Sequence, residues 1–165
     1  MNFLEQLVAE WYAYKGYFVD TNIRIGRRPR GGFEGEIDVV AYDPKDKTLV
    51  HLEASSAADS WERRRKKFRK KFDTARKYYK SIFRFKYRGI KQVAIVGFAR
   101  PKRDDYLGKK VELISIPEMI ALIAEEMKKF SPTKKAIPEK YPLLRVIQFA
   151  TWYGSQRELR KYNTK

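Results

Sequence analysis

Two neighbouring segments of the sequence carry carboxylates that a hairpin would place on one face. Residues 36–42 and 48–55 are rich in β-branched and aliphatic side chains, which predicts two strands. The segment between them, Asp43-Pro-Lys-Asp-Lys47, has the composition of a turn, so a hairpin is expected. Asp38 and Glu53, one on each strand, can then bring carboxylate oxygens to one hard cation such as Mg²⁺, with water in the remaining positions.

Side-chain alternation sorts this hairpin into a polar face and an aliphatic face. The polar face contains Glu36, Asp38, Val40 and Tyr42 of the first strand and His51, Glu53 and Ser55 of the second; the aliphatic face contains Ile37, Val39, Ala41, Val50, Leu52 and Ala54. The alternative is that the acids simply form the solvated face of a surface hairpin, as most carboxylates do. His51, on the same face as Glu53, is either a general base near neutral pH or only a polar neighbour of the metal site. Glu36 either assists Asp38 or is a surface acid.

The run Gly35-Glu-Ile-Asp-Val-Val-Ala41, the short turn and the run Leu49-Val-His-Leu-Glu-Ala-Ser55 resemble the core of the PD-(D/E)xK nuclease superfamily. This superfamily includes type II restriction endonucleases and archaeal Holliday-junction resolvases. The resemblance implies a restriction-endonuclease-like α/β fold, in which helices flank a central mixed β-sheet, and the hydrolysis of phosphodiester bonds in DNA. It also implies Mg²⁺ as the cofactor, with Mn²⁺ as a substitute, bound by Asp38 and Glu53.

A glutamate in the first expected helix, residues 2–15, is a further candidate. Glu5, followed by Gly16-Tyr17-Phe18, resembles the opening of resolvase-type cores, in which a helical glutamate precedes a Gly-aromatic strand entry. The resemblance implies that Glu5 is an accessory acid on the water shell of the metal. Asn2 and Glu5 also have the spacing of a capping box. Capping is therefore the alternative role of Glu5, with Glu10 as the substitute acid.

The sequence departs from the family at one important position. The second half-motif of the family is D/E-x-K, but here the run reads Glu53-Ala54-Ser55. A lysine at that place helps to orient the attacking water and offsets the charge that develops on the phosphate. The hydroxyl of Ser55 carries no charge. Either the cation comes from elsewhere in the fold, or the site has lost catalysis and only binds DNA.

The helix expected over residues 59–80 can supply the missing cation. Its apolar row consists of Trp61, Phe68, Phe72, Ala75 and Tyr79. Arg64, Lys67 and Lys71 fall at i, i+3 and i+7, one stripe beside that row. Because Lys71 borders the buried side, we predict that it replaces the motif lysine, with Arg64 and Lys67 as phosphate clamps. The alternative is that all three are solvated surface charges.

Basic residues dominate the charge of the chain. The 165 residues have a formal net charge of +17, and residues 61–88 alone hold 14 basic and 2 acidic side chains. A basic block of this density beside a carboxylate pair predicts a nucleic-acid backbone as the partner. The residues predicted to bind double-stranded or branched DNA are Arg27, Arg28 and Arg30 of a loop over 26–35, together with Arg64, Lys67 and Lys70. A non-catalytic DNA-binding protein on the same scaffold and an RNA-binding protein are the alternative functions.

The remaining patterns predict strands over 17–25, 92–98 and 111–116, and helices over 117–130 and 141–159. We interpret residues 1–130 as a nuclease domain and residues 131–165 as a basic C-terminal extension packed on it. The absence of cysteine excludes disulfides and zinc-thiolate or iron–sulfur sites. No apolar run reaches the roughly 20 residues that span a bilayer. We therefore expect a cytoplasmic protein without a membrane partner, and the family resemblance suggests a homodimer.

Overall fold

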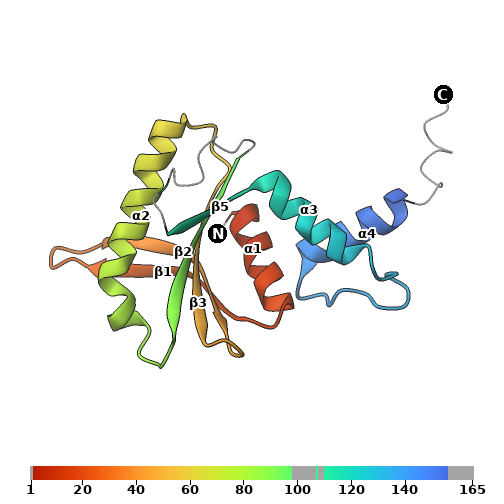
Figure 1. Ribbon diagram of the computed structural model, residues 1–165, viewed down its shortest axis with the longest axis horizontal. Helices are drawn as coiled ribbons and strands as arrows, with labels where there is room; N and C mark the ends of the chain where they lie inside the picture. Colours follow the sequence, from red (N-terminus) through yellow and green to blue (C-terminus); the bar gives the residue numbers. More distant parts are fainter. Residues whose placement is uncertain (1, 98–106, 108–109, 156–165) are drawn as a thin grey trace. The chain divides into compact units, whose positions relative to one another are not determined.

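The computed structural model describes residues 2–97, 107 and 110–155. Its elements are, in chain order, α1 (Phe3–Tyr14), β1 (Phe18–Arg27), β2 (Phe33–Asp43), β3 (Thr48–Ser55), α2 (Trp61–Ile82), β4 (Gly89–Val96), β5 (Val111–Ser115), α3 (Ile116–Met127) and α4 (Pro142–Ser155). The predicted α/β class, a mixed sheet with flanking helices, is confirmed (Figure 1).

Within the described residues the strands form one sheet in the order β1-β2-β3-β4-β5. β1, β2 and β3 are antiparallel neighbours, and β3, β4 and β5 are parallel ones. The predicted hairpin is confirmed as β2 and β3, and Asp43 Oδ1 in its turn accepts a hydrogen bond from the Lys45 N–H at 2.9 Å. Because a parallel pair needs a long crossover, the chain passes through α2 between β3 and β4.

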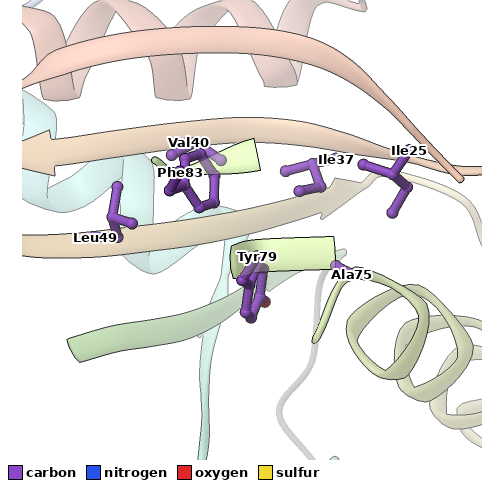
Figure 2. Close-up of a cluster of buried hydrophobic side chains, with 7 residues drawn as sticks. All are labelled: Ile25, Ile37, Val40, Leu49, Ala75, Tyr79 and Phe83. Atoms are coloured by element: carbon purple, nitrogen blue, oxygen red, sulfur yellow. The ribbon is translucent and has the colours of Figure 1, made fainter. Parts of the chain in front are cut away.

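Helices α1 and α2 cover opposite faces of the sheet (Figure 1). α1 buries Leu4, Leu7 and Val8 against it. Figure 2 shows the cluster on the α2 side, formed by Ile25, Ile37, Val40, Leu49, Ala75, Tyr79 and Phe83. Because both faces are covered, every residue of β3 from Leu49 to Ala54 is buried. The alternative of a solvated hairpin face is therefore wrong for Asp38 and Glu53, whereas Glu36 is exposed.

The alternation of faces is broken once along β2. Ile37 and Val40 lie in the same buried cluster against α2 (Figure 2), although strict alternation puts them on opposite faces. The position predicted for Ile37 is therefore wrong. Opposite this point Asn22 of β1 has a φ of 55°, a left-handed conformation that asparagine tolerates better than most residues. The pairing of Thr21 with Val39 and of Ile23 with Ile37 keeps one register across this point, so neither strand carries an inserted residue.

The first predicted loop is shorter than the sequence suggested. β1 continues to Arg27, which pairs with Phe33 of β2, so only residues 28–32 form the turn. Gly31 and Gly32 in this turn have φ values of 92° and 78°, which glycine adopts without strain. Glycine, proline and arginine had indicated a longer loop, but cross-strand pairing extends the hairpin beyond the buried part of the sheet.

The chain divides into two compact units, Met1–Ile116 and Pro117–Lys165. This division precedes the boundary after residue 130 that we interpreted from the sequence. The packing of residues 131–165 on the first unit stays a prediction, and residues 156–159 of the last predicted helix lie outside the described residues.

The second unit is held together by a buried glutamine. Gln148 of α4 accepts a hydrogen bond from the Ile137 N–H at 2.9 Å and donates to the carbonyls of Lys135 at 2.8 Å and Phe130 at 3.1 Å. These bonds tie the segment between α3 and α4 to the last helix. None of the helices in the described ranges combines the length and apolar character needed to cross a membrane.

Candidate active site

Three charged side chains meet at one point between the sheet and α2. Asp38 comes from β2, Glu53 from β3 and Lys71 from α2. Lys71 Nζ donates to Asp38 Oδ1 at 2.7 Å, to Asp38 Oδ2 at 2.8 Å and to Glu53 Oε2 at 2.5 Å. Asp38 is 5% exposed and Glu53 is 0% exposed, whereas the Lys71 side chain is 38% exposed. The structure thus brings together the two predicted metal ligands and the predicted replacement cation.

The register of the hairpin and the pitch of α2 explain this meeting. Val39 pairs with Leu52 across the antiparallel strands β2 and β3. Asp38, just before Val39, and Glu53, just after Leu52, are therefore neighbours. Lys71 lies one helical turn before Ala75, which is buried against the sheet. Its aliphatic stem can therefore follow the apolar surface while the ammonium reaches the acids.

Each carboxylate oxygen in the cluster has a hydrogen-bond partner. Asp38 Oδ2 also accepts from the backbone N–H of Ala54 at 3.0 Å. Glu53 Oε1 lies 2.7 Å from His51 Nε2. Asp38 is therefore held by a rigid backbone donor, and Glu53 is held by another side chain.

The electrostatics of the cluster favour extra positive charge. Burial, followed by the negative charge of Asp38, raises the pKa of Glu53 to about 9. For Lys71 burial opposes the charged form, but the carboxylates of Glu53 and Asp38 outweigh it and raise the pKa. Both pKa values move upward because two buried acids lie side by side and hold protons more tightly than separated groups do. The same arrangement attracts a cation.

The donor set fits a divalent metal with few protein ligands. No group of three or more His, Cys, Asp or Glu side chains able to hold a metal is found among the described residues. Asp38 and Glu53 nevertheless direct three oxygens to the single cation position that the Lys71 ammonium occupies. Carboxylate oxygens with water completing the shell are the ligands that Mg²⁺ and Mn²⁺ accept. The two acids fit such an ion once Lys71 moves aside.

A small pocket opens beside the cluster. It has a volume of about 110 Å³ and is lined by Ala54, Ser55, Lys67, Phe68 and Lys71. Ser55 ends β3, and its hydroxyl accepts a hydrogen bond from the Ala57 N–H at 3.4 Å. Ser55 therefore lines this pocket together with Lys67 and Lys71 of α2.

The carboxylate of Glu5 forms the capping box of α1. It accepts from the Asn2 N–H at 3.0 Å and from Asn2 Nδ2 at 2.6 Å, so this predicted alternative is confirmed. Glu10 is buried and accepts from Gln6 Nε2 at 2.9 Å. The accessory role implied for Glu5, or for Glu10 in its place, stays a prediction.

Arg64, predicted as a phosphate clamp, is largely buried. Its side chain is 9% exposed, it donates from an Nη atom to the Ala57 carbonyl at 3.0 Å, and its guanidinium lies 4.9 Å from the ring centre of Trp61. These contacts hold the segment between β3 and α2. The alternative of a solvated surface charge is therefore wrong for Arg64, and its role as a phosphate clamp stays a prediction.

The other predicted DNA contacts are exposed. Lys67 is paired with Asp59 at 3.0 Å, and its side chain is more than half exposed. Lys70 is exposed on the same helix, and Arg27, Arg28 and Arg30 are exposed at the β1–β2 turn. Figure 1 shows this turn projecting from the sheet past α2. The contacts of these residues with DNA stay predictions.

His51 is a buried neighbour of the acids. It is 1% exposed, with Nδ1 2.6 Å from the Tyr79 hydroxyl and Nε2 2.7 Å from Glu53 Oε1. Burial lowers the pKa of His51 to about 3, against the opposing attraction of the Asp38 carboxylate. This pKa makes His51 a poor general base at neutral pH and favours the interpretation as a polar neighbour.

Sequence reasoning missed the residues behind His51. Tyr79, Gln92 and Arg76 continue a hydrogen-bonded chain away from it. Tyr79 was assigned to the apolar row, because tyrosine at helical spacing is usually a core residue. Gln92 carried a usable signal, since it is a polar residue at the start of the apolar run QVAIVGF and a buried amide needs partners.

Comparisons with known proteins establish the fold alone. No protein-family model matches this chain, and no curated protein matches it. A crystal structure of AF1548, a protein of unknown function, is similar, with a TM-score of 0.54 and 18% sequence identity over 98% of this chain and 88% of that chain. The α/β architecture described above thus recurs in a solved structure.

Proposed function

We propose that this protein is a metal-dependent DNA endonuclease of restriction-endonuclease-like architecture that hydrolyses phosphodiester bonds. The observation that carries the proposal is the convergence of Asp38, Glu53 and Lys71 on one point. A buried ion-pair cluster is weak evidence for a stabilising role, because desolvation offsets much of the attraction. Strongly shifted pKa values beside a pocket instead favour a functional site.

Each of the three side chains has a role in this hydrolysis. Asp38 and Glu53 would hold Mg²⁺, which polarises the phosphate and lowers the pKa of a bound water. Lys71 sits at the solvent side of the acids, where its ammonium stabilises the negative charge that develops on the phosphate oxygens. Water adds to phosphorus, the bond to the leaving oxygen breaks, and that oxygen takes up a proton. Ser55 lines the approach without contributing charge.

The basic surface of α2 supports DNA as the substrate. The exposed basic residues of this helix are Arg63, Lys66, Lys67, Arg69, Lys70, Arg76, Lys77 and Lys80. One of them, Lys67, lines the same small pocket as Lys71, so a phosphate backbone that contacts this part of α2 passes close to the cluster. Backbone contacts of this kind position a strand without selecting a sequence. A homodimer, which presents two such sites to two strands, belongs to the same proposal.

Cleavage of DNA in the presence of a divalent metal tests the proposal. Supercoiled plasmid, linear duplex, branched and single-stranded DNA are incubated with the protein and Mg²⁺ or Mn²⁺, and parallel reactions contain a chelator. We expect at least one substrate to be cut with metal and none with chelator. Asp38→Ala is the control and is expected to be inactive.

Two outcomes contradict this expectation in different ways. Cleavage that persists in Asp38→Ala means that the activity comes from another site or another protein. No cleavage of any substrate, combined with metal-independent DNA binding, supports the alternative of a non-catalytic DNA-binding protein on this scaffold.

The salt dependence of DNA binding tests the role of α2. If about six phosphates are neutralised, the logarithm of the association constant falls with the logarithm of salt concentration at a slope of about −5 or steeper. Lys66→Gln and Lys70→Gln are each expected to reduce the magnitude of that slope by about 1. Lys45→Gln, in the exposed β2–β3 turn, is the matched control and leaves the slope unchanged. A slope near zero in the wild type removes α2 from the DNA interface.

A further inference from the structure

A buried chain of hydrogen bonds ends on Glu53. An Nη atom of Arg76 donates to Gln92 Oε1 at 2.5 Å, and Gln92 Nε2 donates to the Tyr79 hydroxyl oxygen at 2.8 Å. The Tyr79 hydroxyl lies 2.6 Å from His51 Nδ1, and His51 Nε2 lies 2.7 Å from Glu53 Oε1. Only Arg76, at the far end, is substantially exposed.

The guanidinium of Arg76 sets the direction of the first two bonds in this chain, and the need of the buried Tyr79 O–H for an acceptor favours one direction for the third. A guanidinium only donates, so Gln92 turns its oxygen to Arg76 and its NH₂ to Tyr79. The Tyr79 oxygen therefore accepts from Gln92. The buried Tyr79 O–H needs an acceptor of its own, and His51 Nδ1, 2.6 Å away, can supply it when that nitrogen carries no proton. A ring nitrogen that accepts carries no proton, so the imidazole proton of His51 is on Nε2 and is donated to Glu53 Oε1.

The Glu53 side chain depends more than that of Asp38 on a hydrogen-bond donor that fixes its orientation. Asp38 has a short side chain and a backbone donor, the Ala54 N–H. Glu53 has one more rotatable bond, and burial together with the negative charge of Asp38 opposes its charged form and raises its pKa. An Nε2–H donor bound to Oε1 keeps Oε2 directed to the cation position beside Lys71.

We propose that His51 is a positioning residue, whose Nε2–H tautomer is selected by Tyr79, Gln92 and Arg76 and which orients the Glu53 carboxylate toward the cation position. Its effect on metal binding and cleavage rests on the proposed function. The tautomer itself does not, which allows the two to be tested separately. Partners that orient a ligand in this way commonly contribute 10- to 100-fold, as an order of magnitude, to metal affinity or activity.

The composition of the chain makes the tautomer directly measurable. His51 is the only histidine, so a long-range ¹H–¹⁵N spectrum of the untagged ¹⁵N-labelled protein reports this ring alone. We expect a pyrrole-type Nε2 and a pyridine-type Nδ1 at neutral pH. Tyr79→Phe, which removes the donor to Nδ1, is expected to move both resonances toward a mixture of tautomers.

The neighbouring tyrosine provides the matched control for that experiment. Tyr78 lies on the same helix, and its hydroxyl bonds to Glu34 instead of the chain. Tyr78→Phe is expected to leave the His51 resonances in place. An Nδ1–H tautomer in the wild type, or resonances that Tyr79→Phe does not move, overturns the proposal.

Two substitutions of His51 measure its effect on the site. His51→Gln retains an N–H donor near the position of Nε2, whereas His51→Asn is too short to reach Glu53. We expect His51→Asn to weaken Mn²⁺ binding and to slow cleavage about 10- to 100-fold, and His51→Gln to recover most of both. Equal losses in the two variants overturn the positioning role. If the wild type neither binds Mn²⁺ nor cuts DNA while the Nε2–H tautomer and its dependence on Tyr79 hold, the nuclease function fails and the His51 arrangement stands.

Discussion

Replacing Lys71 by methionine is expected to abolish DNA cleavage and to leave DNA affinity nearly unchanged. Methionine preserves the length of the aliphatic stem but removes the ammonium that contacts both acids. Losing one preorganised group that stabilises charge in the transition state costs a rate factor of about 10² to 10³. DNA affinity changes little because Lys71 is one of many basic residues on α2 and is already neutralised by Asp38 and Glu53.

Lys70→Met is the matched control for this substitution. Lys70 precedes Lys71 on α2 and is exposed, so its loss removes the same charge from the DNA-facing surface without touching the acids. We expect normal cleavage at saturating DNA and a small loss of affinity. Cleavage rates and binding constants of both variants decide the assignment. If Lys71→Met loses activity and affinity to the same extent, Lys71 is a DNA contact and not the replacement for the motif lysine.

Asp38→Asn is expected to abolish metal binding together with cleavage. Asparagine has the size of aspartate and still accepts the Ala54 N–H, so the fold is retained while one of the two anionic ligands is lost. Because the charge of Asp38 contributes to the raised pKa of Glu53, the same substitution is expected to lower that pKa. Titration with Mn²⁺ and the cleavage assay measure the first effect, and the pH dependence of unfolding measures the second.

Glu36→Gln provides the comparison within the same strand. Glu36 lies two residues before Asp38 in β2 but is exposed, so its neutralisation leaves Mn²⁺ binding and cleavage near the wild-type level. Retained metal binding in Asp38→Asn contradicts the ligand assignment. Equal losses in the two variants indicate that overall charge, and not a local metal site, controls the activity.

The hairpin and its acids were predictable because they depend on local rules. Alternation along two adjacent strands places Asp38 and Glu53 together once the turn at Asp43 sets the register. The stripe that contains Lys71 was also predictable, since the helical repeat places it beside the buried row of α2. These inferences needed only periodicity and the order of the elements.

Burial was harder to predict, because it is a property of the tertiary structure. Polar side chains usually indicate exposure to solvent, but Asp38, His51 and Glu53 are buried. His51 bonds to Glu53, and Lys71 bonds to both acids. Arg64 lies in a run of charged residues and is nevertheless buried, because the Ala57 carbonyl and the Trp61 ring receive its guanidinium. Trp61 stands at the i, i+3 spacing of neighbours on one helix, but the Ala57 carbonyl lies seven residues away and outside the helix, where helical spacing does not signal a contact.

The break in alternation at Ile37 had the same origin. Nothing in the residues of β2 announces it, and the left-handed residue opposite this point, Asn22, lies on the neighbouring strand. The predicted face of Asp38 was unaffected, because the break lies at Ile37, before Asp38, and alternation holds from Asp38 to Val40, which pairs with His51.

The cluster is divided between a strand pair, which carries Asp38 and Glu53, and a helix, which carries Lys71. Under the proposed function, cleavage of DNA would therefore require the helix to be docked on the sheet. Asp38 and Glu53 come together when the hairpin closes, but Lys71 joins them only when α2 docks on the sheet in the correct position. Sliding the helix by one turn displaces Lys71 by about 5.4 Å, well beyond hydrogen-bond reach. Under the proposed function, a nascent or misdocked chain would therefore carry the acids without their ammonium and spare the DNA of its own cell until folding is complete.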